Sequence, residues 1–262
     1  MRDPAPSRLA ELVDELARAH RRTVPAPRGL PYLGLDHASG TPLRLLEDLA
    51  ARGIFRKYEL VLDLAASLGA TSRWLALRLG CEVVAATAVD EAPAADVLGR
   101  RARVGAHVRV VAAAPGALPA RDGRFTHVWA VESLARVPDP AAALTEACRA
   151  LRPGGTIAVQ ELVPGGDEAP RIAGWRFASA DERLATLRDA GFVDVETRDR
   201  SDEASERSAQ VGAARARLVE RLRADPVLAP LAAAREALAQ ALATGALRIV
   251  QMVGYRPTTR RA

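Results

Sequence analysis

The stretch VLDLAASLGATS, residues 61–72, places a carboxylate and several small residues where they can hold a nucleotide-like ligand. Asp63 lies near the end of an apolar run, and a loop containing Ala65, Ser67 and Gly69 follows before a helical pattern begins. A strand, a tight loop and a helix in this order commonly cradle a bound cofactor, because small side chains let the backbone approach the ligand closely. We therefore expect this loop to be a binding loop.

Polar residues also follow two later apolar runs. The run at 82–87 ends in Thr87, with Asp90 three residues later, and the run at 125–131 ends in Val131 before Glu132. In an open sheet of parallel strands, ligands bind outside the carboxyl ends of the strands, which meet at one edge. The pattern therefore predicts one site at that edge.

Short apolar runs alternate with helical patterns from residue 59 onward. The runs show little polar alternation, which is typical of parallel strands buried on both faces. They lie at 60–65, 82–87, 108–113, 125–131 and 156–162, and two further strand candidates lie at 193–201 and 246–257. We expect an α/β fold, a Rossmann-like doubly wound sheet of about seven strands with helices on both faces.

The segment before residue 59 carries helical patterns. Apolar spacing predicts a helix over about residues 8–22 with Ser7 as its cap, and Thr41 with Pro42 opens a second helix that ends at Gly53. We expect residues 1–58 to form an N-terminal helical cap over the carboxyl edge. Residues 59–257 are then the α/β domain, with a helix-rich insertion at 202–245, and residues 258–262 are a disordered tail.

Composition excludes several classes of protein. Lysine and arginine outnumber aspartate and glutamate by 37 to 32, but the arginines are interleaved with acids and only 4% of residues are aromatic, which argues against nucleic-acid binding. No apolar run approaches the roughly 18 residues that span a bilayer, and the N-terminal segment has no signal-peptide core. Cys81 and Cys148 lie in apolar or helical patterns, as reduced core thiols do. We expect no membrane insertion and a cytoplasmic location.

The phrase LTEACRALRPGGTIAVQELV, a helix ending in Arg-Pro-Gly-Gly before a strand, resembles the class I S-adenosylmethionine-dependent methyltransferases. The likeness is to their small-molecule branch, the ubiquinone/menaquinone and sarcosine methyltransferase type. It extends from about Tyr32 to Pro257 and includes LGLDHASGTPLRLLEDL and LRDAGFVDVETRDRS. The resemblance implies S-adenosylmethionine as the cofactor, a small-molecule methyl acceptor and an antiparallel seventh strand.

The resemblance also assigns the residues around the cofactor. They are Asp63, Ala65, Ser67, Gly69, Thr87, Ala114, Val131 and Glu132. The chain departs from the family at several of these positions. Ala65 and Ser67 stand where the family has glycines, and Thr87, Ala114 and Thr126 stand where it commonly has acids, so cofactor binding is weakened or lost if nothing replaces those acids.

These departures leave a second hypothesis open, a catalytically degenerate methyltransferase-fold protein that acts as a binding or scaffolding partner. Such a protein would form a homodimer, or a heteromer with an active relative. Leucines of the 202–245 region are a possible contact surface, with packing inside their own chain as the alternative. They are Leu218, Leu222, Leu228 and Leu231.

In this family the acceptor pocket comes from the N-terminal helices and the segment between the fifth and sixth strands. Tyr32, His37, Trp175 and Phe177 are the candidates there, either as contacts to an apolar or aromatic acceptor or as packing residues. His37 is the one candidate catalytic base, with a role in loop packing as the alternative. We expect His127, within an apolar run, to be a core histidine, and Glu161 to be a further candidate site residue at the carboxyl edge of the sheet. The sequence contains no spacing typical of metal ligands.

Overall fold

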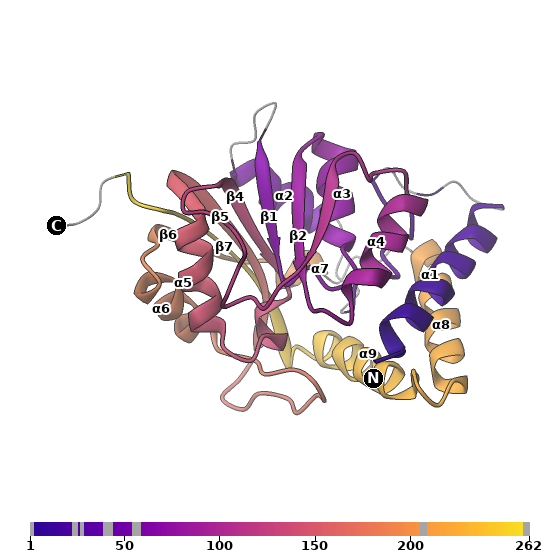
Figure 1. Ribbon diagram of the computed structural model, residues 1–262. Coiled ribbons are helices and arrows are strands. Elements are labelled where there is room, and N and C mark those ends of the chain that lie inside the picture. The colour runs from indigo at the N-terminus through magenta and orange to yellow at the C-terminus, as the bar shows by residue number, and fades with distance from the viewer. Residues whose placement is uncertain are drawn as a thin grey trace.

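The computed structural model describes residues 3–22, 26, 29–38, 44–53, 59–204 and 209–258. Its strands are β1 Leu60–Leu64, β2 Glu82–Thr87, β3 Val108–Ala112, β4 Phe125–Val131, β5 Leu151–Pro164, β6 Val193–Asp199 and β7 Leu247–Tyr255. They form one sheet in the order β3-β2-β1-β4-β5-β7-β6 (Figure 1). β7 is antiparallel to β5 and β6, and the other pairs are parallel. The expected α/β sheet with an antiparallel seventh strand is confirmed.

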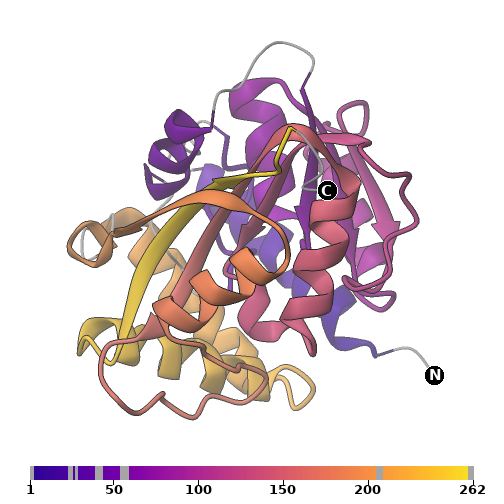
Figure 2. The same ribbon diagram turned by 90° about the vertical axis from the view of Figure 1, so that its left-hand side faces the viewer.

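Helices lie on both faces of the sheet (Figure 2). They are α1 Ala5–Arg21, α2 Arg44–Arg52, α3 Ala70–Leu79, α4 Ala92–Arg101, η1 Leu134–Arg136, α5 Pro140–Ala150, α6 Ala180–Asp189, α7 Ser201–Ala204, α8 Ala209–Ala224 and α9 Ala229–Ala243. Alternate residues of each strand enter opposite core layers, because successive side chains point to opposite faces. Leu62 and Val128 pack with α5 and α6, whereas Val61 and Trp129 pack with α2 and α3.

The first helix begins earlier than its sequence pattern predicts. α1 starts at Ala5, and the Asp3 carboxylate accepts a hydrogen bond from the Ala5 backbone N–H at 2.9 Å. The prediction of Ser7 as its cap was therefore wrong, because Asp3 provides an earlier acceptor and Pro4 sits at the cap position with helical φ and ψ. Thr41 and Pro42, predicted to open the second helix, lie outside the described residues.

α1 packs against α4 and α8, and this contact accounts for the leucines of the C-terminal helical region. Leu218, Leu222 and Leu228 are at most 2% exposed, in a cluster with Leu12 and Val13 of α1. Leu231 is partly buried against the same cluster. The hypothesis that these leucines form a partner surface was wrong, since they pack within their own chain, against helices rather than the sheet.

β5 is longer than its apolar core predicts. Phe125 of β4 pairs with Leu151, and the register then shifts so that His127 pairs with Thr156. The RPGG segment is therefore a bulge within β5 and does not precede the strand. A side chain at Gly155 would lie 2.7 Å from Leu151 Cδ1, so the bulge requires a glycine there.

None of the helices in the described part of the chain has the length and apolar character needed to span a bilayer.

α6 begins with a reciprocal cap. The Ser179 hydroxyl accepts from the Glu182 N–H at 3.2 Å, and the Glu182 carboxylate accepts from the Ser179 N–H at 2.7 Å. This capping box fixes the end of the loop that carries Trp175 and Phe177.

We predict that Ser179→Ala lowers the free energy of unfolding by about 1 kcal/mol, because one helix donor then loses its partner. Chemical denaturation of the two proteins measures the change. Ser179→Asp keeps an acceptor at the cap and is the matched control. Equal losses for the alanine and aspartate variants would contradict the assignment of the cap.

Candidate functional site

A polar pocket lies at the carboxyl ends of β1 and β4. Its lining residues are Asp36, His37, Ala38, Asp63, Ala65, Ala66, Ser67, Ala70, Thr71, Val131, Glu132, Ser133, Arg136 and Trp175. The cavity has a volume of about 40 Å³. Five of the eight predicted cofactor residues line it, and two more, Gly69 and Thr87, adjoin the same loop.

The loop after β1 adopts a conformation that normally favours glycine. Ala65 has φ 53°, Ser67 φ 48° and Gly69 φ 75°, so three alternate residues are left-handed. The first two carry side chains that make this conformation costly, at roughly 1–2 kcal/mol each. Backbone bonds hold the loop, since Ala66 N donates to Ala86 O at 2.9 Å and Gly69 N donates to Ala66 O at 2.8 Å.

Glu132 shares this strain. It has φ 52°, and its N–H donates to Gln160 O at 2.6 Å. Strained non-glycine residues concentrate at binding and catalytic sites, where the surrounding structure holds them for a purpose. Ala65, Ser67 and Glu132 all line the same pocket, so the strain marks it as the candidate site.

Asp63 is the buried carboxylate at the centre of the site. It is 2% exposed, and its Oδ2 accepts a hydrogen bond from Ser72 Oγ at 2.5 Å. Burial raises the pKa of Asp63 to about 7, although the Ser72 bonds and Arg73 act in the opposite direction. A cationic group bound beside Asp63 would favour its charged form.

A carboxylate, that of Glu91, lies beside Thr87. Ser67 Oγ donates to Glu91 Oε1 at 2.8 Å, and Thr87 Oγ1 lies 3.1 Å from Glu91 Oε2. Arg136 Nη2 also reaches Glu91 Oε1, at 3.1 Å, from across the pocket. The carboxylate therefore lies at the end of β2, although Glu91 is four residues beyond the strand, at the start of α4. Sequence reasoning considered only Asp90 for this role and missed Glu91.

Thr126 and Ala114, which stand where the family commonly has acids, both lie away from the pocket. Thr126 is at the amino end of β4, where its hydroxyl accepts from Leu60 N and lies near Leu60 O, each at 3.0 Å. It joins the starts of β1 and β4, at the edge opposite Asp63, so reading it as a lost cofactor anchor was wrong. Ala114 is exposed in the turn after β3 and does not line the pocket.

The predicted acceptor residues divide into two groups. Trp175 lines the pocket, its ring stacks on Phe177 with centroids 5.8 Å apart, and Arg136 lies 5.9 Å from the Trp175 ring centroid. Tyr32 is not brought to the pocket. It is 1% exposed, its hydroxyl donates to Leu98 O at 2.8 Å, and burial raises its pKa to about 12.

His37 also lines the pocket. Burial lowers the pKa of its imidazole, although Asp36 and Glu132 act in the opposite direction. Among the described residues, its buried Nε2 has no hydrogen-bond partner. Arg235 of α9 donates to the backbone oxygens of His37 at 2.7 Å and Leu35 at 3.1 Å, so the C-terminal helices hold this segment in place.

A buried polar chain supports Glu132 from behind. Gln160 Nε2 donates to Glu132 Oε1 at 2.9 Å, and Gln251 Nε2 lies 2.9 Å from Gln160 Oε1 and 2.6 Å from Leu45 O. All three side chains belong to residues at most 6% exposed. Sequence reasoning missed the two glutamines, but their signal was present, since each interrupts an apolar strand.

Two ion pairs complete the buried charges near the site. Arg73 Nη2 lies 2.5 Å from Asp36 Oδ2, and Arg183 Nη2 lies 3.3 Å from Glu161 Oε2. Glu161 does not line the pocket, and burial raises its pKa to about 7. His127 is buried, as expected of a core histidine, and its Nδ1 lies 3.0 Å from Thr126 Oγ1. Within the described ranges, no three His, Cys, Asp or Glu side chains gather as a metal site requires.

Comparison with known proteins identifies relatives of this chain in sequence and in fold. The family described as "Methyltransferase domain" matches residues 62–159. Sarcosine/dimethylglycine N-methyltransferase of Halorhodospira halochloris is 31% identical over 145 residues, 52% of this chain and 52% of that protein. The chain spans about half or less of the length of the curated relatives it matches.

Solved structures share the fold over nearly the whole chain. The crystal structure of the cyclase SpnF has a TM-score of 0.71 and 22% identity, covering 97% of this chain and 95% of that one. Phosphoethanolamine N-methyltransferase 2 of Haemonchus contortus, solved with phosphomonomethylethanolamine and S-adenosylhomocysteine, has a TM-score of 0.65 and 15% identity, covering 93% and 57%. At such identities the likeness concerns the fold alone.

We predict that Ala65→Gly raises the free energy of unfolding by up to about 1 kcal/mol, because glycine adopts a positive φ without steric cost. Ala66→Gly is the control, because Ala66 is not among the residues with positive φ. We expect it to lower the free energy of unfolding, since glycine gives the unfolded chain more conformational freedom. Urea denaturation compares the three proteins. A loss of stability in both variants would show that residue 65 is not strained.

Asp63 predicts a specific dependence of stability on pH. Its pKa is about 7 in the fold, against about 3.9 in an unfolded chain, so between these values the folded state holds a proton that the unfolded state has released. The free energy of unfolding therefore falls as pH rises from about 4 to 7. In Asp63→Asn this part of the fall disappears, whereas the part from Glu161 remains. Chemical denaturation at a series of pH values from about 4 to 7 measures the free energy of unfolding of both proteins. If it changes with pH equally in the wild type and in Asp63→Asn, the raised pKa is not that of Asp63.

Proposed function

We propose that this chain, whose residues 62–159 match a methyltransferase domain, is a class I S-adenosylmethionine-dependent methyltransferase that transfers a methyl group to a small organic acceptor. One observation carries the proposal. The loop after Asp63 keeps a glycine-type conformation at Ala65 and Ser67 despite their side chains. Such strain persists when close approach of the backbone to a ligand is needed.

The residues present fit S-adenosylmethionine, which supplies a methyl group already activated on a sulfonium. We infer that Asp63 and the loop of Ala65, Ser67 and Gly69 hold its methionine part. Glu91 then accepts hydrogen bonds from the ribose hydroxyls in place of an acid at Thr87. Ala114, in the turn after β3, remains the candidate for the adenine end, and Val131 and Glu132 close the other side. The charged Glu91 acceptor is worth more than the threonine hydroxyl alone.

The acceptor would lie against His37 and the Trp175–Phe177 pair. Burial lowers the pKa of His37, and we infer that its Nε2 offers a lone pair to a hydroxyl or ammonium proton of the acceptor. Trp175 offers a flat apolar surface beside Arg136. The protein needs to do little beyond aligning the acceptor with the methyl group and holding that proton.

Residues 1–58 and the 202–245 insertion form, on this proposal, a cap that closes the acceptor side. Support comes from Arg235, which binds the backbone of the His37 segment, and from α1, which packs against α8. A cytoplasmic location stays a prediction from the sequence.

A second candidate function is a methyltransferase-fold protein that no longer binds the cofactor and serves as a binding or scaffolding partner, as a homodimer or with an active relative. Two observations favour it. The cavity is only about 40 Å³, and the Glu91 carboxylate already has partners in Ser67, Thr87 and Arg136. In this state the site stabilises the fold and binds nothing.

Titration calorimetry with S-adenosylmethionine and S-adenosylhomocysteine separates the two candidates. The enzyme proposal expects a Kd below about 1 mM, where binding is worth about 4 kcal/mol, and Glu91→Gln weakens it about tenfold through the loss of a charged acceptor. Asp90→Asn removes the same charge one residue away and is the matched control. Equal effects of the two substitutions would refute the role of Glu91, and no binding by the wild type would refute the enzyme.

A rescue variant tests the second candidate directly. If the site has lapsed, Thr87→Asp with Ala114→Asp gains a cofactor-dependent rise in melting temperature that the wild type lacks. A strong rise already present in the wild type would rule out the scaffolding function.

A further inference from the structure

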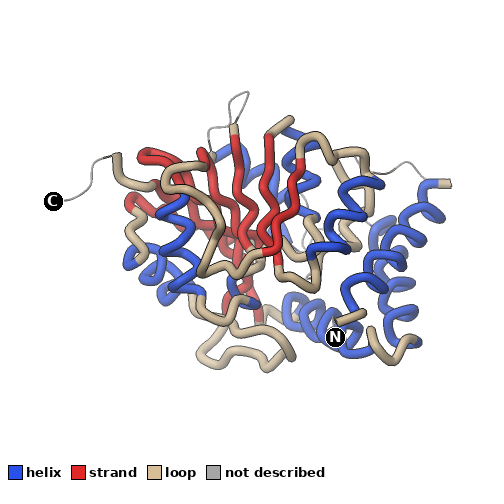
Figure 3. Tube along the Cα trace, viewed as in Figure 1, coloured by secondary structure: helices blue, strands red, loops and turns tan. Residues whose placement is uncertain are grey.

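A second hollow lies on the face of the sheet that carries α5 and α6. It has a volume of about 240 Å³ and is bounded by strands β1, β2 and β3 and by the connection from β3 to β4. That connection, residues 113–124, contains no helix and is drawn as a loop in Figure 3. Because no helix covers this end of the sheet, side chains of the strands reach the hollow.

The strand register makes the floor apolar. Leu62 of β1 pairs with Val84 of β2, and Ala86 of β2 pairs with Val111 of β3. These four side chains share one face, and Leu118 and Phe125 close the floor from the loop side. Asp63 and Thr87 belong to the alternate positions of the same strands, so the hollow is separate from the polar pocket.

The loop that forms the wall is tied to α5. Arg149 donates to Ala120 O at 2.9 Å and to Asp122 Oδ1 at 2.6 Å, and Glu146 accepts from Leu118 N at 3.1 Å. Glu146 and Arg149 also pair with each other at 2.8 Å. These contacts hold the wall in place, so the hollow is a built feature of the fold.

The rim of the hollow carries only positive charge. Arg109 extends from β3, in register with Val84, and Arg121 and Arg124 extend from the loop. Within the described part of the chain, none of these three guanidinium groups has a carboxylate partner, whereas most other arginines near the sheet are paired. An apolar floor below three unpaired cations is complementary to an anion with an apolar body.

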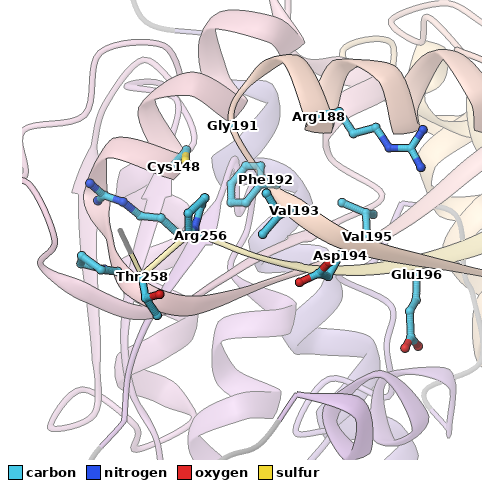
Figure 4. Close-up of a pocket in the computed structure, with 12 residues that line it drawn as sticks. Cys148, Arg188, Gly191, Phe192, Val193, Asp194, Val195, Glu196, Arg256 and Thr258 are labelled. Atoms are coloured by element: carbon cyan, nitrogen blue, oxygen red, sulfur yellow. The ribbon is translucent and has the colours of Figure 1, made fainter. Parts of the chain in front are cut away.

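A larger hollow elsewhere in the molecule shows the contrast (Figure 4). It has a volume of about 890 Å³ along the edge strand β6, and its charged residues, Arg188 and Arg256 with Asp194 and Glu196, are of both signs. Its charges therefore select neither an anion nor a cation, and nothing in the structure shows what would occupy it.

We propose that the hollow over β1, β2 and β3 is a second ligand site, which binds a small amphipathic carboxylate with a short alkyl or aryl chain. The chain of the ligand lies on Leu62, Val84 and Ala86, and its carboxylate meets Arg109 and Arg124. The volume of about 240 Å³ lies below the range of about 300–1,000 Å³ found for drug-sized ligands, so the site suits a body of few carbons. The proposal is independent of methyl transfer, because it uses no residue of the polar pocket.

Calorimetric titration with octanoate and with octylammonium tests the site, since the two probes share a chain and differ in charge. We expect octanoate to bind with a Kd below about 1 mM and octylammonium not to bind. Saturating S-adenosylhomocysteine leaves the octanoate affinity unchanged, which separates this site from the polar pocket. Equal binding of both probes, no binding of octanoate, or competition by S-adenosylhomocysteine would overturn the proposal.

Two variants locate the binding. Arg109→Gln with Arg124→Gln weakens octanoate binding at least tenfold, and Val84→Phe, which fills the hollow, does the same without changing charge. Arg22→Gln with Arg217→Gln removes two exposed arginines elsewhere and is the matched control for net charge. Thermal melting verifies that each variant is folded. If the control weakens octanoate as much as the rim variant, or if neither the rim variant nor Val84→Phe weakens it, octanoate binds elsewhere and the assignment is wrong.

Discussion

The left-handed backbone after β1 is the constraint on which the candidate site depends. At Ala65 and Ser67 the chain holds a conformation that their side chains oppose, and the parallel pairing of β1 with β2 and β4 holds it there. The ladder brings Ala86 O to Ala66 N, so the loop cannot relax without losing that bond. Asp63, one residue before the strand ends, is buried between β2 and β4. Its raised pKa follows from that burial.

Charges buried around the loop are held in place by partners. Asp36 forms an ion pair with Arg73, and Glu161 forms one with Arg183. Glu132 accepts a hydrogen bond from Gln160, the first of two buried glutamines that connect it to Leu45 O. Removing one partner of a buried pair typically costs about 3–5 kcal/mol, because the other charge is left uncompensated. Burying two charges costs desolvation energy that their attraction does little more than offset, so these pairs are weak evidence for a gain in folding stability. Their role is instead to hold the side chains around the loop in fixed positions.

Glu91 brings a carboxylate to the end of β2, where Thr87 itself offers only a hydroxyl. The carboxylate reaches the end of β2 from the first turn of α4, where Thr87 and Ser67 bind it. The same contacts satisfy Glu91 within the protein, together with Arg136 from the opposite wall. A ligand at this site would therefore compete with, or add to, bonds that already exist. The small cavity and the bonded Glu91 carboxylate therefore both belong to one network of contacts.

The sequence by itself determined the succession of strands and helices, the tight loop after Asp63 and the cap at Ser179, because each depends on residues close together in the chain. Only the tertiary structure decided which side chains meet. Thr126 faces Leu60 at the far edge of the sheet, Tyr32 lies in the core beneath Arg73, and the leucines of α8 pack on α1. The position of a residue in its strand predicts the edge and the face of the sheet on which its side chain lies, but not the side chain that it contacts. Partners such as Glu91 and Arg136, or Gln160 and Gln251, are tens of residues apart, and only the packing of the sheet brings them within bonding distance.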